Sequence, residues 1–194
     1  MNKMKTILST LLLLVASSSI QAQSLKDLFL KMPQNLCPAL SEYNRLEIVD
    51  NQKNQKVMQT RNLFRTYSKM EELTDDYARL TVTKNSQKEM KLLTLNDETK
   101  IIMVVSTILV DDTPDSSVAF YSTDWQPLPA QAYLPESISE DIRKIEVESA
   151  TGRLTITTNN APLLLNYDGV KPTPIPTSSS TYAWKSEQGK YVKE

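Results

Sequence analysis

The sequence predicts an α+β fold in which N-terminal helices pack on an antiparallel β-meander. Two stretches with helical spacing of apolar residues come first, at 24–32 and from 41 onward. The most apolar run outside the N-terminus, 101–110, is rich in β-branched residues, which favour a strand over a helix. Short turns connect this run to its neighbours, so antiparallel pairing of successive strands is the economical topology.

The first helix is predicted over 24–32, with Ser24 as its N-cap and Pro33 as its stop. Its apolar residues recur at helical spacing and form one stripe facing the core: Leu25, Leu28, Phe29 and Met32.

The second helix is predicted to begin at Ser41 and to fade into the polar run 50–56. We expect its core-facing residues to be Tyr43, Leu46 and Val49. Its solvent-facing residues should be Glu42, Asn44, Arg45 and Glu47. The following stretch, 57–72, is ambiguous, because it fits either a helix or a loop with short strands. A helix there would be lined by Leu63, Phe64, Tyr67, Met70 and Leu73.

The meander begins at 77–83, where apolar residues alternate and place Ala78, Leu80 and Val82 on one face. Further strands are predicted at 88–95, 101–110 and 117–123. The run 101–110 does not alternate, so we expect both of its faces to be covered. Prolines at 127 and 129 end regular pairing.

A second unit is predicted from residue 135 onward. A short helix at 136–142 precedes a hairpin formed by 145–148 and 154–157, with Gly152 in the left-handed position of its turn. After it we expect a buried strand at 163–165, an extended connector at 171–180 and a terminal hairpin that turns at 186–189.

Helix followed by strands thus occurs twice, which fits a weak duplication. Residues 23–194 have the length of one domain, which can also be divided into halves at 23–130 and 131–194.

The N-terminal residues 1–22 have the pattern of a signal peptide. Lys3 and Lys5 precede an apolar segment, and Ala22 is a suitable residue for cleavage. We therefore expect the mature chain to begin at Gln23 and to be exported to the periplasm or the extracellular space, with no membrane span. Without Lys3 and Lys5, the 22 basic residues fall to 20 against 23 acidic ones, a net charge of −3. No basic run stands out, so nucleic acid and anionic membrane surfaces are not expected as partners.

Residue counts exclude several kinds of chemistry. The chain has no histidine, which removes serine–histidine and cysteine–histidine catalysis and histidine-bound zinc or iron. Its one cysteine, Cys37, cannot form a disulfide within the chain and is predicted to be a buried thiol. Three glycines leave no phosphate-binding loop. The acidic loop 111–115 lacks the glycine of an EF-hand, so neither a metal nor another cofactor is expected.

Aromatic side chains are the best candidates for a partner-binding site. Tyr121, Trp125 and Tyr133 gather at the end of the meander, and Trp184 belongs to the terminal hairpin. An exposed platform of such rings can anchor a protein or stack on a sugar ring. The alternative is that these rings fill the core, because tryptophan is highly buried on average.

Several stretches together resemble one protein family. They are DLFLKMP at 27–33, NRL at 44–46 followed by Asp50, KLL at 91–93, and FYSTDW at 120–125 followed by Leu128. In these stretches the chain is similar to the exported Bacteroidetes family called domain of unknown function 3256. The resemblance covers most of the mature chain and implies a cell-envelope or secreted protein. It implies no activity and no catalytic residues.

These observations favour a non-enzymatic, exported binding module of the bacterial cell envelope, with an unidentified protein or glycan as its partner. Two alternatives stand beside it. A carboxylate-dependent glycan hydrolase needs only two carboxyl groups about 5–9 Å apart, and acidic residues are plentiful here. The other alternative is a structural or assembly subunit, which its oligomeric state in solution would reveal.

Overall fold

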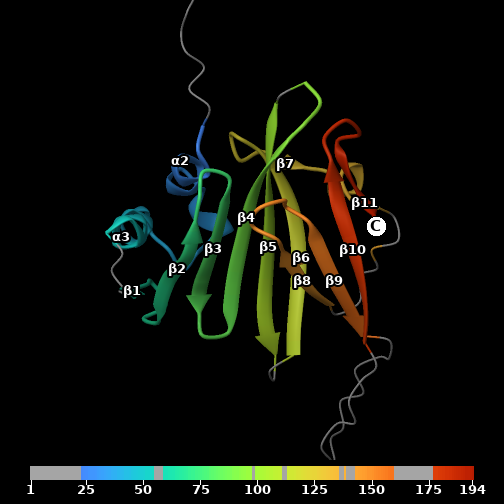
Figure 1. Ribbon diagram of the computed structural model, residues 1–194. Helices are drawn as coiled ribbons and strands as arrows, with labels where there is room; N and C mark the ends of the chain where they lie inside the picture. Colours follow the sequence, from blue (N-terminus) through green and yellow to red (C-terminus); the bar gives the residue numbers. More distant parts are fainter. Residues whose placement is uncertain are drawn as a thin grey trace, which may run out of the picture.

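The computed structural model describes residues 23–54, 59–97, 99–110, 113–135, 138, 143–159 and 177–194. Within these residues the protein consists of a seven-stranded and a four-stranded antiparallel sheet with two short α-helices (Figure 1). The predicted combination of N-terminal helices and an antiparallel meander is confirmed. The protein is nevertheless mainly β, because strands far outnumber helices in the described residues.

The helices lie in the N-terminal part of the chain, as predicted. The helical elements are α2 (Leu25–Leu30), the 3-10 turn η1 (Gln34–Leu36) and α3 (Glu42–Lys53). At the start of α2, the N–H of Asp27 donates to the Ser24 hydroxyl (3.3 Å). At the start of α3, Ser41 and Asn44 each donate a backbone N–H to the other's side-chain oxygen, at 3.1 Å in both cases. These reciprocal bonds satisfy N–H groups that the first turn leaves unpaired.

α3 buries a different face from the predicted one. Of the three expected core residues only Val49 is buried, whereas Tyr43 and Leu46 are 73% and 50% exposed. Asn44 and Arg45, expected outside, are buried instead. The Asn44 amide donates to a backbone carbonyl of the following strand (3.1 Å), and the Arg45 guanidinium donates to a carbonyl just before the helix (3.0 Å). These bonds satisfy buried carbonyl groups, and this requirement overrides the apolar periodicity.

The first seven strands form one sheet in which every strand pairs with its neighbours in sequence. They are β1 (Thr60–Arg61), β2 (Tyr67–Leu73), β3 (Tyr77–Thr83), β4 (Ser86–Thr94), β5 (Lys100–Val110), β6 (Thr113–Ser122) and β7 (Pro127–Leu128). This order is the predicted meander. β6 begins earlier than predicted, because Thr113 and Pro114 pair with Val110 and Leu109 of β5.

The ambiguous stretch 57–72 contains short strands and a turn, so the second of its two predicted forms is confirmed for the residues from 59 onward. Asn62 organises the turn between β1 and β2. Its amide donates to the carbonyl of Val82 (2.9 Å), and its carbonyl oxygen accepts from the N–H groups of Phe64 (3.0 Å) and Thr66 (3.1 Å).

β5 is covered on both faces only along its first half. Residues 101–105 are buried, as predicted, but Ile108, Leu109 and Val110 are exposed. The strand is eleven residues long, and its end projects below the helices in Figure 1. The prediction of a strand covered on both faces was therefore wrong for the second half of β5, where the apolar run extends beyond the layers that pack on it.

The remaining strands form the second sheet, in the order β11-β10-β9-β8. They are β8 (Arg143–Val147), β9 (Leu154–Asn159), β10 (Thr177–Lys185) and β11 (Lys190–Lys193). Both predicted hairpins of this unit are confirmed. Gly152 has the expected left-handed backbone, with φ of 71°.

Residues 177–180, predicted as part of a connector, belong to β10 and pair with β9. The serines and threonines there tolerate a strand, and composition alone did not distinguish the two conformations. The predicted helix at 136–142 (all but one residue of it), the predicted strand at 163–165 and the rest of the connector lie outside the described residues. The helix on which a duplication depends is therefore not described.

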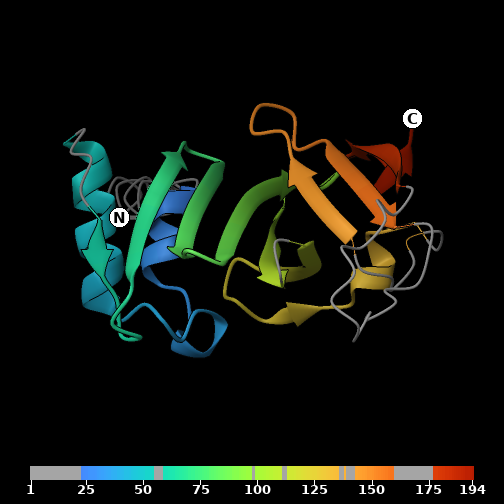
Figure 2. The ribbon, with the colours of Figure 1, turned by 90° about the horizontal axis from the view of Figure 1, so that it is seen from below.

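The layers of the molecule are seen best in Figure 2, where the helices lie on one face of the large sheet and the second sheet on the other. One core joins the helices to the large sheet and includes Leu28, Phe29, Ile48, Leu80, Met90 and Ile102. The other core joins the two sheets and includes Tyr77, Met103, Phe120, Ile145, Leu154 and Tyr191. The halves 23–130 and 131–194 thus share a core. In the described part of the chain, no helix has the length and apolar character needed to cross a bilayer.

Candidate functional site

The aromatic residues predicted as a binding site do not form one exposed cluster. Trp125 is only 6% exposed, has a left-handed backbone (φ 60°), and donates its indole N–H to the carbonyl of Leu28 in α2 (3.0 Å). The half-buried Tyr121 ring packs on it, with 5.6 Å between ring centroids. Both rings belong to the core beneath the helices, which is the alternative considered for them.

Tyr133 and Trp184 lie on the opposite side of the large sheet. Tyr133 packs on Phe120 with 4.9 Å between ring centroids, and Trp184 lies 6.4 Å from Tyr133 and 5.2 Å from Tyr191. This separation follows from strand geometry, because Phe120 and Tyr121 are successive residues of β6 and therefore face opposite sides. The structure brings the predicted residues together in two pairs, one on each face.

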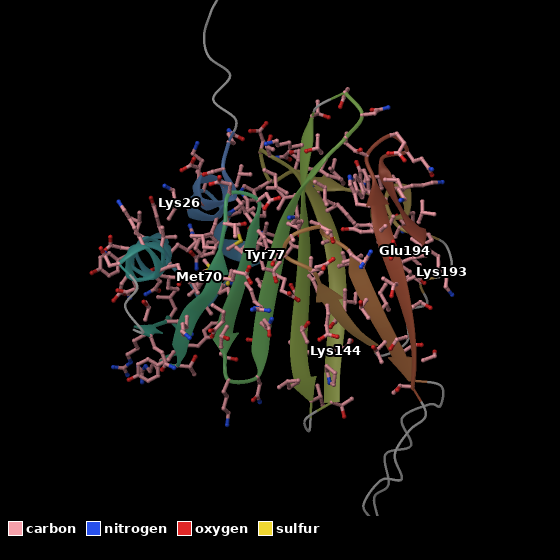
Figure 3. The ribbon with its side chains drawn as sticks, viewed as in Figure 1. Lys26, Met70, Tyr77, Lys144, Lys193 and Glu194 are labelled. Carbon is pink, nitrogen blue, oxygen red and sulfur yellow. The ribbon has the colours of Figure 1, made fainter. Side chains whose placement is uncertain are left out.

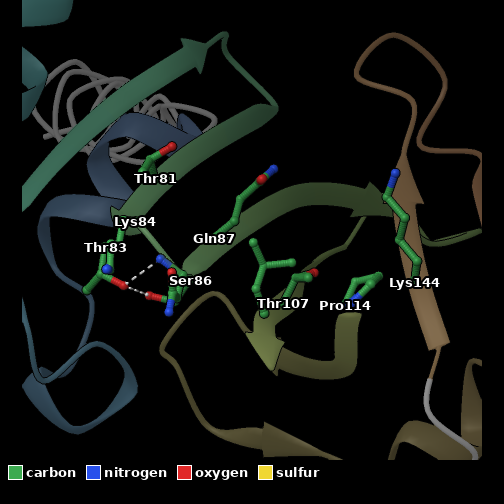
Figure 4. A pocket seen from close by; sticks show the side chains of 10 residues that line it. Thr81, Thr83, Lys84, Ser86, Gln87, Thr107, Pro114 and Lys144 are labelled. Atoms are coloured by element: carbon green, nitrogen blue, oxygen red, sulfur yellow. Dashed lines mark hydrogen bonds between the residues drawn. The ribbon is translucent and has the colours of Figure 1, made fainter. Parts of the chain in front are cut away.

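A polar groove runs between the open face of β3–β5 and the edge strand β8. It consists of two adjoining hollows of about 360 and 560 Å³. Both are lined by Thr81, Gln87, Thr107 and Lys144, which come from β3, β4, β5 and β8 in turn (Figure 4). The groove exists because the second sheet packs mainly on β5 and β6 and leaves this face of β3 and β4 only partly covered around Arg79, Thr81 and Gln87. Its concave shape and converging polar groups make it the candidate functional site.

The floor of the groove contains paired hydroxyl groups and two side-chain amides without a hydrogen-bond partner among the described residues, those of Gln87 and Asn85. The hydroxyl oxygens of Thr83 and Ser86 are 2.8 Å apart, and those of Thr107 and Ser116 are also 2.8 Å apart. The Gln87 amide makes no hydrogen bond with any described residue, and Figure 4 shows it extending into open space. A free amide offers both donors and an acceptor to a ligand.

The edge of β8 forms the wall of the groove, and two of its outward N–H groups are already used. The N–H of Ile145 donates to the Ser116 hydroxyl (3.1 Å), and the N–H of Val147 donates to the Glu89 carboxylate. Lys144, labelled on β8 in Figure 3, precedes them. An unpaired edge would accept another strand. Because these donors are taken, a ligand at this wall meets side chains rather than free backbone N–H groups.

Glu89 is the buried acid of the groove. Its carboxylate accepts a 2.5 Å hydrogen bond from the Tyr77 hydroxyl in addition to the N–H of Val147. Burial raises the pKa of Glu89, and the hydrogen bond from Tyr77 partly opposes that rise. Burial and the bond to Glu89 also raise the pKa of the Tyr77 hydroxyl, which therefore stays a donor. Glu89 thus joins β3, β4 and β8 into one unit.

Most other charged groups around the groove are paired with one another. Lys144 lies 2.6 Å from Glu146 on β8, and Arg79 lies 3.4 Å from Glu72 across β2 and β3. Such pairs contribute little stability at an exposed surface, but they neutralise the local field. Lys84, at one end of the groove, forms no ion pair with a described residue, so that end alone offers a free positive charge.

Lys91 holds the far end of the β8 wall. Its side chain is buried, and its ammonium donates to the Asp76 carboxylate (2.7 Å) and to the Ser149 carbonyl (2.6 Å) in the turn between β8 and β9. The Tyr191 hydroxyl donates to the Gly152 carbonyl in the same turn (2.8 Å). These bonds tie the turn to the large sheet, so the wall is positioned before a ligand arrives.

The groove contains carboxyl groups but no metal-binding cluster. Its acidic lining residues are Glu71, Glu89 and Glu146. Among the residues that the structure describes, no group of three or more acidic, histidine or cysteine side chains is arranged to hold a metal ion. Cys37 is buried, as predicted, and burial raises the pKa of its thiol. The described side chains of the groove can therefore form hydrogen bonds with a ligand, and beyond that they can support only acid–base chemistry.

The groove could not be predicted from the sequence because its wall, β8, comes from far along the chain from β3, β4 and β5. Thr81, Gln87 and Thr107 are ordinary residues for the solvent face of a strand. One signal was present. The alternation in β3, with Arg79, Thr81 and Thr83 between apolar residues, indicates a strand with one uncovered face, and the groove lies on that face.

The fold and the groove define a class of protein, a helix-covered antiparallel meander with a second, smaller sheet on its other face. The chain belongs to the family described as Protein of unknown function (DUF3256), whose family model matches residues 17–167. Among solved structures, it is similar to a domain of an uncharacterized protein from Porphyromonas gingivalis W83. That similarity has 18% sequence identity and a TM-score of 0.66, and it covers 88% of this chain and 97% of the other. It shows a shared fold. A comparison with curated proteins gave no match.

Proposed function

We propose that the protein is an exported binding module of the Bacteroidetes cell envelope and that it binds its partner in the polar groove. The signal-peptide pattern at 1–22 supports export. The similar structure from Porphyromonas gingivalis supports a Bacteroidetes origin. The observation that carries the binding proposal is the free Gln87 amide, which lines both hollows of a groove in which the hydroxyl groups of Thr83, Ser86 and Thr107 are hydrogen-bonded.

A hydroxyl-rich ligand such as a glycan fits this groove better than an extended peptide. A peptide would gain most of its affinity by adding a strand to β8, but the N–H groups of Ile145 and Val147 are already bound. Sugar hydroxyls, by contrast, both donate and accept, as the Gln87 amide does. The pairing of Lys144 with Glu146 further favours an uncharged ligand.

We propose that the protein binds without turnover. Glu89 is the most buried acid in the groove, and its carboxylate is engaged by the Tyr77 hydroxyl and the Val147 N–H. These bonds assign it to holding strands together.

A carboxylate-dependent glycan hydrolase is the second candidate. It is favoured by one observation, which is that Glu71, Glu89 and Glu146 line the same groove while burial raises the pKa of Glu89, as general acids require. Release of reducing ends from a bound glycan by the wild type, lost in Glu89→Gln, would establish this candidate. Binding with no such release supports the non-enzymatic proposal.

The binding test uses the purified mature chain on arrays of neutral oligosaccharides, charged oligosaccharides and peptides, followed by calorimetry on each ligand that binds. Gln87→Ala should weaken binding about tenfold, because it removes hydrogen bonds that the ligand makes with the groove. The matched control is Gln188→Ala, an exposed glutamine in the turn before β11. Equal affinity of Gln87→Ala and wild type would place the ligand elsewhere, and no ligand with a Kd below about 1 mM would contradict the proposed function.

A further inference from the structure

Exposed apolar residues gather at one end of the molecule. Of the eight large apolar side chains exposed among the described residues, five come from α3 and the start of the large sheet: Tyr43, Leu46, Leu63, Phe64 and Tyr67. Figures 1 and 2 both show α3 beside β1 at this end. The contact is direct, because the N–H of Leu63 donates to the carbonyl of Ala39 just before α3 (2.9 Å). Apolar patches of this kind mark interaction surfaces.

The turn at 61–65 is rigid and displays two of these side chains. Leu63 and Phe64 are 56% and 59% exposed, whereas Asn62 beside them is buried and bonded on both its amide and its carbonyl oxygen. Arg65 takes a left-handed backbone, with φ of 62°. A backbone held in this way presents Leu63 and Phe64 without a further loss of conformational freedom on binding.

Two arginines flank the exposed apolar pair of this turn. Arg61 and Arg65 are exposed, and neither forms an ion pair or a side-chain hydrogen bond with a described residue. Other described arginines are engaged: Arg79 with Glu72 and Arg153 with Glu194. Residues 61–65 therefore form a basic turn, in which unpaired guanidinium groups adjoin Leu63 and Phe64. Arginine is a preferred residue for ion pairs at interfaces.

The outer face of α3 has the opposite charge. Glu47 follows Tyr43 and Asp50 follows Leu46, each by four residues, so each carboxylate lies one turn beyond an exposed apolar side chain. Neither acid forms an ion pair with a described residue. Tyr43, Leu46, Glu47 and Asp50 together form an acidic helix face.

We propose that the protein forms a symmetric dimer in which the basic turn of each copy packs on the acidic helix face of the other. The chain itself presents both complementary surfaces, apolar against apolar and arginine against carboxylate, so a second copy fits as the occupant. Because the two patches adjoin, one two-fold axis lets each basic turn meet the acidic helix face of the other copy. Neither patch contains a groove-lining residue, so the dimer is independent of the proposed ligand site.

Charge reversal tests the dimer by sedimentation velocity on the mature chain at concentrations up to about 100 µM. We expect a dimer for the wild type. Arg61→Glu/Arg65→Glu and, separately, Glu47→Lys/Asp50→Lys should each raise the dimer Kd about tenfold or more, because like charges then face each other. An equimolar mixture of the two variants should recover a dimer, since each basic surface then meets an acidic one. Lys26→Glu/Lys193→Glu, a reversal of two exposed lysines outside both patches, is the matched control and should leave the Kd unchanged.

The mixture makes the result specific to this pairing. A wild type that stays monomeric, a dimer that neither reversal weakens, or a mixture that stays monomeric would overturn the proposal. Circular dichroism and thermal melting are the checks that each variant is folded. If Arg65→Glu disturbs the left-handed position, Arg61→Glu alone replaces the double variant and should weaken the dimer by a smaller factor.

Discussion

Replacing Asn62 by alanine should remove the support of the turn between β1 and β2. The Asn62 amide donates to Val82, and its carbonyl oxygen accepts from the N–H groups of Phe64 and Thr66. The Val82 carbonyl keeps a 2.7 Å bond from the Ser68 hydroxyl, so it is not left without a partner. The two N–H groups lose their acceptors at partly buried sites. At about 1 kcal/mol for each of these three hydrogen bonds, we expect a loss of about 3 kcal/mol in the free energy of unfolding.

Urea unfolding of the purified protein, followed by tryptophan fluorescence, measures this loss. The control is Asn96→Ala, which changes an exposed turn asparagine and should shift the free energy of unfolding by less than about 0.5 kcal/mol. If Asn62→Ala is as stable as this control, the hydrogen-bond network does not hold the turn, and the rigidity of the basic turn loses its physical basis.

Four further substitutions test the core and the groove. Trp125→Ala should cost about 3–5 kcal/mol, as expected for a buried ring, and should lower the melting temperature; a stable variant that only binds its partner more weakly would return Trp125 to a surface role. Burial raises the folded-state pKa of Glu89 above its unfolded value, so the ionised carboxyl costs stability that the protonated form does not. The free energy of unfolding of Glu89→Gln should therefore increase relative to that of the wild type as the pH rises from about 4 to about 8. If urea unfolding shows the same difference in stability between the two proteins over this range, burial does not disfavour the ionised carboxyl. By the same assay, Ile102→Ala should lower the free energy of unfolding by about 2–5 kcal/mol, and Ile108→Ala by less than about 1 kcal/mol. Equal losses would contradict the finding that only the first half of β5 is covered.

Local signals in the sequence predicted much of the fold. Ser24 and Ser41 cap the helices where expected, and the alternation of Ala78, Leu80 and Val82 identified the buried face of β3. Gly152 marked a hairpin turn because its left-handed backbone suits glycine. Each of these features depends on residues a few positions apart, and the sequence displays such spacings directly.

Features that depend on distant partners could not be predicted in this way. The inward face of α3 is set by carbonyl groups that Asn44 and Arg45 satisfy, and one of those carbonyls belongs to β1. The end of β5 is exposed because no layer reaches Ile108, although its composition resembles the buried half. The groove likewise appears only when β8 packs on β5 and β6, far from it in sequence, and the Val147 N–H then reaches Glu89 on β4.

The hydrogen bond from Trp125 to Leu28 joins residues that are 97 positions apart. A ribosome makes the chain from its N-terminus at about 5–20 residues per second, so α2 exists for several seconds before its anchor is synthesised. During that interval the apolar stripe of α2 can already pack on α3, β3 and β4, which precede Trp125 in the chain. The packing of the first helix is completed only when Trp125 closes over it, after most of the large sheet has been made.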